Sequence, residues 1–164
     1  MREIEFRGHE SPLFSGEKKK KKPKWLYGSL RNTSEEHPQI AEPPMGLWCN
    51  VEPETVGQYT GMKDKNGVKI YEGDVVESVV LRVPRYSMES ERRFGVVKWD
   101  RDVAAFRLYR DDDPDDSLEL FRGHKLTVKG NVFDDPVLKK RYGDIYFMEM
   151  WNHRSGLNQE KTND

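Results

Sequence analysis

Short runs of apolar residues alternate with polar ones along most of the chain, which is the pattern of half-buried β-strands. Near the N-terminus, Ile4 and Phe6 alternate with charged neighbours. Further strand-like segments rich in Val, Leu, Ile and aromatic residues lie at 25–30, 56–60, 68–71, 75–83, 94–99, 104–109, 118–121 and 126–133. From Val56 to Asn131 turn signals recur about every eight to twelve residues, as in sandwiches and barrels. The pattern predicts a mainly β protein.

One segment carries the sequence signals that mark the start of a helix. Asp135 is an N-cap residue followed by a proline at the first helical position, and basic residues follow near the favoured C-terminal end of the helix dipole. We predict a short helix near residues 136–142. Stretches rich in Gly, Pro and charge predict inserted loops at about 8–23, 31–45 and 110–117. Residues 143–164 are expected to be a C-terminal extension whose end is disordered.

Composition limits the size of the core. The chain has 164 residues, the length of one ordinary domain, which we place at residues 1–142. Charged residues make up 35% of it, against a usual value of about 25%. The longest apolar runs are four residues, so we expect no membrane span and no secretory signal. A single cysteine, Cys49, excludes an internal disulfide and suits the reducing cytoplasm.

Charge is unevenly divided along the chain. Residues 1–36 carry nine basic and six acidic side chains, whereas the remainder carries 19 basic and 23 acidic ones. A run of lysines directly precedes two aromatic residues, and together they form a candidate nucleic-acid-binding set: Lys18, Lys19, Lys20, Lys21, Lys22, Lys24, Trp25 and Tyr27. The alternative is a loop kept soluble by its charge and paired across space with the aspartate run at 111–116.

Nothing in the sequence indicates catalysis or a cofactor. Residues 62–73 resemble a calcium-binding loop, but Met62 occupies the first ligand position and Gly73 the position of the bidentate glutamate. The aspartate run has no fixed geometry, and the four histidines have no partner at metal-ligand spacing. No nucleotide-binding or nucleophile motif occurs. We therefore expect no catalytic residue, no metal site and no cofactor.

One long segment carries a family signature. Residues 54–77, ETVGQYTGMKDKNGVKIYEGDVVE, closely resemble the central motif of the YopX family of phage and prophage proteins. The flanking segments MREIEFRG, KWLYG, FGVVKWD, FRLY and KLTVKGNVFDDPVL agree in the same order, so the resemblance covers most of residues 1–138. The sequence departs from the family pattern at the lysine loop 17–24, the acidic loop 110–117 and the extension after residue 142.

The resemblance implies a mostly β fold, with a sheet folded on itself into a partly open, SH3-like pseudo-barrel. It implies a phage or prophage setting in a bacterial host, and no known catalytic residue. The signature residues are expected to be structural, forming turns and capping backbone groups: Gln58, Tyr59, Gly61, Asp64, Gly67, Tyr71, Gly73 and Asp74.

The leading functional hypothesis is a non-enzymatic phage or prophage accessory protein that binds a partner in the cytoplasm of the host. The expected partner is a protein, including a second copy of this chain in a homo-oligomer. An alternative is a nucleic-acid-binding module that uses the basic loop at 18–24 and its neighbouring aromatic residues. A third hypothesis is an enzyme whose site has no recognisable motif.

Overall fold

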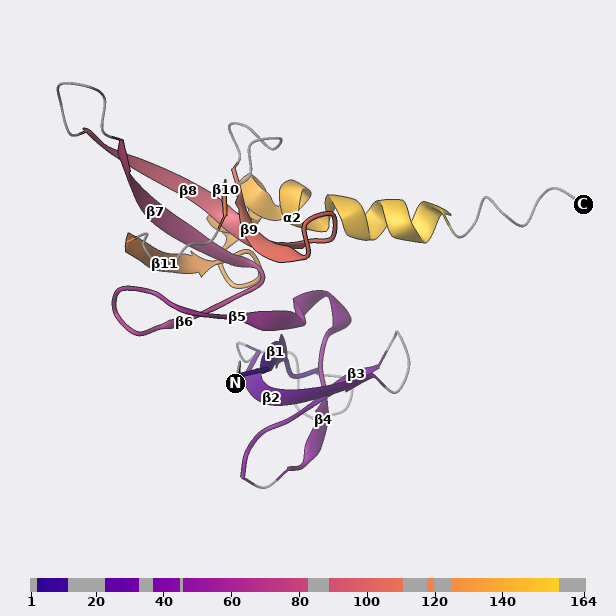
Figure 1. The fold of residues 1–164 in the computed structure, drawn as a ribbon. Helices are drawn as coiled ribbons and strands as arrows, with labels where there is room; N and C mark the ends of the chain where they lie inside the picture. Colours follow the sequence, from indigo (N-terminus) through magenta and orange to yellow (C-terminus); the bar gives the residue numbers. More distant parts are fainter. Residues whose placement is uncertain are drawn as a thin grey trace, which may run out of the picture. The chain divides into compact units, whose positions relative to one another are not determined.

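In the computed structural model, the residues described are 3–11, 23–32, 37–44, 46–82, 89–110, 118–119 and 125–156. The chain divides into two compact units, Met1–Glu72 and Gly73–Asp164. Each unit contains its own antiparallel sheet (Figure 1). The mainly β fold expected from the sequence is therefore confirmed.

The N-terminal unit contains a six-stranded sheet in the order β4-β3-β2-β1-β5-β6. The strands are β1 (Phe6–His9), β2 (Trp25–Asn32), β3 (Pro38–Ala41), β4 (Trp48–Asn50), β5 (Gly57–Lys63) and β6 (Lys69–Tyr71), with a 3-10 turn η1 (Pro53–Thr55) before β5. The sheet curls until the end of β4 meets the end of β1. There Glu10 and Val51 form an isolated bridge, and the Ser11 N–H donates to the Asn50 carbonyl at 2.9 Å. This partial closure confirms a sheet folded on itself into a partly open barrel.

The inside of this curled sheet is a small apolar core. Leu26, Ile40 and Val51 are each at most 2% exposed. Partly buried residues complete the cluster: Phe6, Leu30, Cys49 and Val56. Cys49 thus packs as a small apolar side chain, as its sequence neighbours indicate. Because side chains alternate across a strand, the neighbours of these core residues point outward from the same strands.

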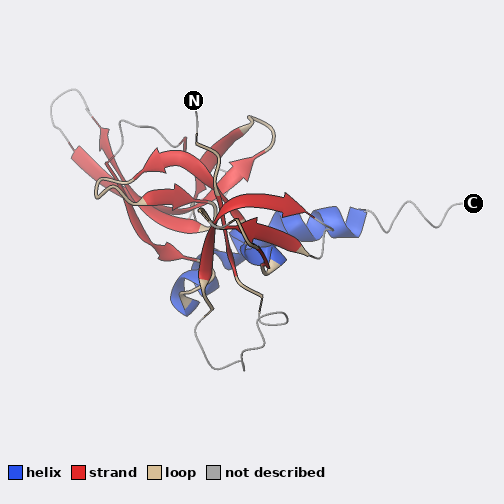
Figure 2. Cartoon of the chain, turned by 90° about the horizontal axis from the view of Figure 1, so that it is seen from below, coloured by secondary structure: helices blue, strands red, loops and turns tan. Residues whose placement is uncertain are grey.

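The C-terminal unit contains a five-stranded sheet in the order β10-β9-β8-β7-β11. Its strands are β7 (Asp74–Arg82), β8 (Glu89–Asp100), β9 (Ala105–Tyr109), β10 (Leu118–Glu119) and β11 (Lys125–Asn131), followed by the helix α2 (Pro136–Gly156), drawn in blue in Figure 2. The helix packs its aromatic residues on this sheet. Val75, Val96, Val132, Tyr142 and Tyr146 form the buried cluster between them.

The helix begins where the sequence predicts but is longer than expected. The Asp135 carboxylate accepts hydrogen bonds from the N–H groups of Val137 (2.8 Å) and Leu138 (3.3 Å), the geometry of an N-cap. It does not end near residue 142, and it continues to Gly156. Tyr146 and Phe147 pack edge-on against Phe133, with ring centroids 5.5 and 6.2 Å apart. This tertiary packing extends a helix whose own sequence signals are weak.

Two of the expected loops also differ from the structure. Strand β1 continues to His9, beyond the expected loop start at residue 8, and β3 lies inside the stretch 31–45. Pro38 is the first residue of β3, a position where a strand tolerates proline. Pairing with β2 on one side and β4 on the other overrides the loop-like composition. The acidic run at 111–116 lies outside the described residues.

Within the described ranges, no helix is both long and apolar enough to cross a membrane.

Candidate functional site

The outer face of β2 carries both of the aromatic residues that the sequence analysis selected. Along this strand Leu26 points into the core and is 1% exposed, whereas Tyr27 points outward and is 40% exposed. Trp25, Tyr27 and Arg31 alternate with inward residues and so lie on the same outer face. Lys18–Lys22 lie outside the described residues.

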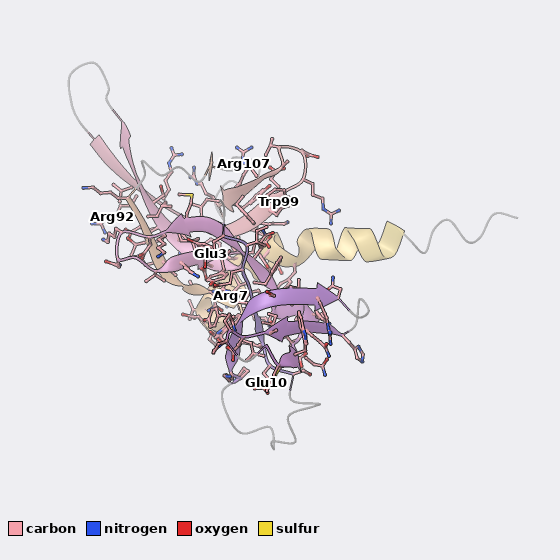
Figure 3. The ribbon with its side chains drawn as sticks, turned by 60° about the horizontal axis from the view of Figure 1, so that its bottom comes forward. Glu3, Arg7, Glu10, Arg92, Trp99 and Arg107 are labelled. Atoms are coloured by element: carbon pink, nitrogen blue, oxygen red, sulfur yellow. The ribbon has the colours of Figure 1, made fainter. Side chains whose placement is uncertain are left out.

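Trp25 belongs to a buried cation–aromatic stack. The Arg7 guanidinium lies 4.7 Å from the ring centroid of Trp25 and 4.9 Å from that of Tyr71. Its Nη2 donates a hydrogen bond of 2.9 Å to the Glu72 carbonyl, and the whole residue is only 6% exposed. The His9 ring also packs against Trp25, with ring centroids 3.9 Å apart. Trp25 is therefore largely used for packing within the unit. Arg7, at the centre of this stack, is labelled in Figure 3.

An exposed counterpart of this stack lies at the other end of β2. The Arg31 guanidinium lies 4.4 Å from the ring centroid of Trp48 on β4, and Trp48 is 39% exposed. Arg31 donates from Nε (3.0 Å) and Nη2 (2.7 Å) to the side-chain oxygen of Gln39. Gln39 in turn donates to the Asn50 side-chain oxygen at 2.8 Å. This row of side chains across β2, β3 and β4 fixes the guanidinium on the indole ring.

We call Tyr27, Arg31 and Trp48 the aromatic–basic patch. In the strand register, Ser29 of β2 pairs with Ala41 of β3, and Ala41 pairs with Trp48 of β4. Trp48 therefore lies level with Ser29, two strands away, and Tyr27 lies two residues before Ser29 on β2. With strands about 4.8 Å apart and about 3.4 Å per residue, their Cα atoms are separated by about 12 Å. The patch therefore presents two partly exposed rings on one sheet face. Trp48 holds the Arg31 cation, and the Tyr27 ring packs against that of Tyr71, with centroids 5.8 Å apart.

Lys24, another member of the predicted set, is paired at the start of β2. Its Nζ lies 3.0 Å from Oε2 of Glu42, and the Tyr27 N–H donates to the other oxygen of this carboxylate at 3.3 Å. The hydrogen bond to Glu42 raises the pKa of the Lys24 ammonium above its usual value. Because the pair is exposed, its contribution to stability is small. Its effect on the surface is to neutralise the acidic side chain beside Tyr27.

The signature residues of the second half of this unit form turns. Asp64 is 7% exposed, and its Oδ1 accepts from the N–H groups of Asn66 (2.7 Å) and Val68 (2.9 Å). Gly67 closes the turn with a φ of +84°. Gly61, at +83°, lies where the register between β5 and β6 shifts. These residues shape the loop between β5 and β6.

The remaining signature residues pack or bond the backbone of their own unit. Tyr59 and Tyr71 are each 4% exposed and stack with ring centroids 5.5 Å apart. The Gln58 N–H donates to the Glu72 carboxylate at 3.0 Å. Asp74, at the start of β7, is 2% exposed. Gly73 has a φ of +79°, which only glycine adopts easily.

Tyr71 also anchors a polar network around Glu5, the residue before β1. Its hydroxyl donates to the Glu5 carboxylate, which also lies 2.7 Å from Lys69 Nζ. Burial raises the pKa of the Glu5 carboxyl, but the hydrogen bonds from Lys69 and Tyr71 outweigh burial and hold this pKa below its usual value. Burial and the bond to Glu5 raise the pKa of the Tyr71 hydroxyl above its ordinary range. The network holds the residue before β1 to β6.

We predict that Glu5→Gln lowers the free energy of unfolding by about 1.5–3 kcal/mol at pH 7, the usual contribution of a hydrogen bond to a charged group. Because the folded-state pKa of Glu5 is depressed, its stabilisation is present above about pH 4.5 and is lost as the pH falls through the folded-state value. Urea denaturation measures this. The difference in free energy of unfolding between the wild type and Glu5→Gln should be smaller below pH 4 than at pH 7.

Glu3→Gln is the matched control for this network. Glu3 lies 2.8 Å from the same Lys69 Nζ but is 57% exposed, so its loss should change stability by less than about 0.5 kcal/mol. Equal effects of the two substitutions at pH 7 would contradict the role assigned to Glu5.

Sequence reasoning missed Arg7, Arg31 and Trp48. For Arg31 a signal was available, because strand alternation in WLYGSLR puts it on the face of Tyr27. For Arg7 and Trp48 the sequence contained no such signal, because the residues that they stack on come from other strands. In the ranges that the structure describes, no three His, Cys, Asp or Glu side chains come together in a group that could hold a metal ion.

Comparison with known proteins identifies a family. The model of the family described as YopX protein matches residues 3–140, which is most of the chain. No curated protein matches this chain.

Proposed function

The chain belongs to the YopX family, and we propose that it is a phage- or prophage-encoded accessory protein without enzymatic activity. It acts in the cytoplasm of the bacterial host by binding a macromolecule on the aromatic–basic patch of its N-terminal unit. The observation that carries this proposal is the Arg31–Trp48 pair, which is fixed by Gln39 and yet exposed.

A prearranged exposed pair favours binding for an energetic reason. Exposed aromatic and arginine side chains are enriched where proteins bind partners, because they contribute large contact area and directed hydrogen bonds. Ordering an arginine at the moment of binding costs about 0.5–1.5 kcal/mol in lost rotamer freedom. Gln39 and Trp48 already hold Arg31 in place, so part of this cost is met in the folded protein.

The non-enzymatic part of the proposal is supported by how three acidic side chains are used. Asp64 shapes a turn, and the half-buried Glu5 holds the start of β1 to β6. Glu77 is 5% exposed and lies 2.6 Å from Lys129 Nζ and 3.3 Å from Arg92 Nη1. Each of these carboxylates stabilises the fold where it lies.

Capture from host-cell lysate tests the proposal. Immobilised full-length protein should retain a component that the double variant Tyr27→Ala/Trp48→Ala loses. Phe94→Leu is the matched control, because Phe94 is similarly exposed, at 38%, but belongs to β8 of the other unit. Running each capture with and without nuclease reports the class of the component.

The proposal predicts that the wild type and Phe94→Leu retain the same component while the double variant loses it. Equal capture by all three proteins would overturn the patch as the binding surface. Matching thermal melts for the three proteins are needed before the comparison is made.

A second copy of the chain is a further protein partner that one observation favours. Leu47 and Trp48 are consecutive and 66% and 39% exposed, and they lead into β4 at the edge of the sheet. We predict self-association, seen by light scattering in moderate salt as a mass above 19.3 kDa that Leu47→Glu lowers. A mass near that of one chain at all micromolar concentrations would contradict it.

A further inference from the structure

We infer that the C-terminal unit binds a phosphate group on the part of its sheet that α2 leaves open. The site consists of Arg92 on β8 and of Lys125 and Lys129 on β11, arranged around the buried carboxylate of Glu77 on β7. We call these three basic side chains the basic cluster. The inference goes beyond the proposed function, because the cluster belongs to the other unit and shares no residue with the aromatic–basic patch.

The strand register places the basic cluster on one face of the sheet. Lys125 and Arg92 both lie directly opposite Val79, one on each neighbouring strand. Glu77 is two residues before Val79 on β7, so its side chain lies on the same face. Lys129 also reaches this carboxylate, with its Nζ 2.6 Å from Oε2. Three cations therefore gather on one face, and the Cα atoms of Lys125 and Arg92 are about 10 Å apart, which is two strand spacings.

The helix α2 covers only the neighbouring part of this face. Val75 and Val96 belong to the core beneath α2 and are at most 1% exposed. Phe94, two residues before Val96 on the same face of β8, is already 38% exposed. The side chain of Arg92, two residues further, is 74% exposed, and Figure 3 shows Arg92 at the end of the sheet that lies away from α2. A ligand can therefore reach the basic cluster.

Positive charge is in excess on this part of the face. The Glu77 side chain is 7% exposed, and Nη1 of Arg92 lies 3.3 Å from its Oε1. A carboxylate removed from water needs cations fixed beside it, so Glu77 holds the head groups of Arg92 and Lys129 in place. Glu77 is the only acidic residue in the described segments around it, 75–79, 92–96 and 125–130. Three cations around one carboxylate leave a surplus of two positive charges.

This surplus suits a phosphate group. A phosphate monoester carries a charge of about −1.5 to −2 at pH 7 and accepts hydrogen bonds on three oxygens, whereas one carboxylate balances only half of the surplus. Among the described residues, Arg92 is paired with Glu77 through Nη1, which leaves its other N–H groups for a ligand. Arginine binds phosphate through parallel N–H groups and lysine binds it as a point charge, and the basic cluster offers both.

Protection of an open sheet edge is the competing explanation for the two lysines. β11 is the last strand of its sheet, and proteins protect such edges with lysines and bulges, both of which β11 carries. Edge protection does not account for Arg92, because β8 is separated from this edge strand by β7. It also gives no role to the carboxylate buried beneath the cations. A phosphate site accounts for all of these features.

Isothermal titration calorimetry with inorganic pyrophosphate tests the inference on the full-length protein in a phosphate-free buffer. The wild type should bind pyrophosphate, and Arg92→Gln, Lys125→Gln and Lys129→Gln should each weaken binding about fivefold, the effect of one unit charge about 4 Å from the ligand in water. Arg101→Gln is the matched control and should leave the affinity unchanged. Arg101 is also exposed, but it lies nine residues after Arg92, about 30 Å away along β8.

Competition against pyrophosphate identifies the source of the phosphate group. A nucleoside diphosphate and a short oligothymidylate show whether the cluster prefers a free nucleotide or a polymer. A tetrapeptide of glutamate carries its charge on carboxylates and should compete more weakly than either of them.

Three results would overturn the inference. The first is no binding of pyrophosphate by the wild type, and the second is competition by the glutamate tetrapeptide as strong as that of the phosphate compounds. The third is unchanged affinity in Lys125→Gln together with self-association of this variant, which would show that the lysines protect the edge. Lys125→Gln is the decisive variant if Lys129→Gln fails to fold, because the structure gives Lys125 no ion pair with Glu77.

Discussion

Gly28→Ala is expected to cost about 3 kcal/mol or more of the free energy of unfolding, the upper part of the range for overpacked sites. A Cβ at this position would overlap the Ala41 carbonyl oxygen and lie 2.9 Å from the carbonyl carbon. These are backbone atoms of the neighbouring strand β3, so they cannot rotate away. The strands β2 and β3 would have to separate, and with them the scaffold of the aromatic–basic patch.

Urea denaturation followed by circular dichroism measures this loss. The matched control is Ser29→Ala, at the next residue of β2, which is exposed and should change stability by less than about 0.5 kcal/mol. A Gly28→Ala variant with the wild-type midpoint would show that β2 and β3 are not in the close contact described.

Gly73→Val is expected to lower the free energy of unfolding by about 3 kcal/mol, of a usual total near 5–15 kcal/mol. At a φ of +79° a β-branched residue is strained by about 1–3 kcal/mol. A Cβ would also overlap the Phe133 ring, lying 2.8 Å from Cζ. The turn cannot move away, because the Gly73 N–H donates to Val97 at 2.9 Å and its carbonyl accepts from Val132 at 3.0 Å.

Gly67→Val separates the two contributions. Gly67 has nearly the same φ, +84°, but nothing lies within 4 Å of a Cβ built there. It should therefore show only the backbone strain, and Gly73→Val should melt at a clearly lower temperature. Equal melting temperatures for these two variants would contradict the overlap with Phe133, and a wild-type melt for Gly73→Val would contradict the turn itself.

Local signals in the sequence predicted the elements that depend on local physics. Strand alternation located most strands, the Asp64–Gly67 turn formed as its residue types require, and Asp135 caps the helix. The continuation of α2 past residue 142 was not predictable in this way, because it involves packing of Tyr146 against Phe133. Strand β3 was missed because pairing on both sides stabilises a segment with the composition of a loop.

The candidate site was predictable only along one strand. Lysine and aromatic residues close in sequence pointed to Trp25 and Tyr27, and the structure exposes Tyr27 but stacks Trp25 on His9 and Arg7. Trp48 meets Arg31 only through the register of three strands. Register depends on the partner strands and turns, so a single sequence does not reveal it.

The division into two units was likewise not visible in the sequence. The boundary at Glu72 and Gly73 falls inside the family signature, in a turn between two well-formed strands. Linkers between compact units usually show a shift in composition, and here there is none. Each sheet has its own core, Leu26 with Ile40 in one and Val96 with Tyr142 in the other.

Photo-crosslinking of the full-length protein to the component that it captures from host-cell lysate, followed by mass spectrometry of the attached peptides, tests most directly the central claim that the aromatic–basic patch binds a partner. The account predicts crosslinks at Tyr27 and Trp48 that Phe94→Leu leaves unaffected. Crosslinks confined to residues outside β2–β4, with Tyr27 and Trp48 unmodified, would contradict it.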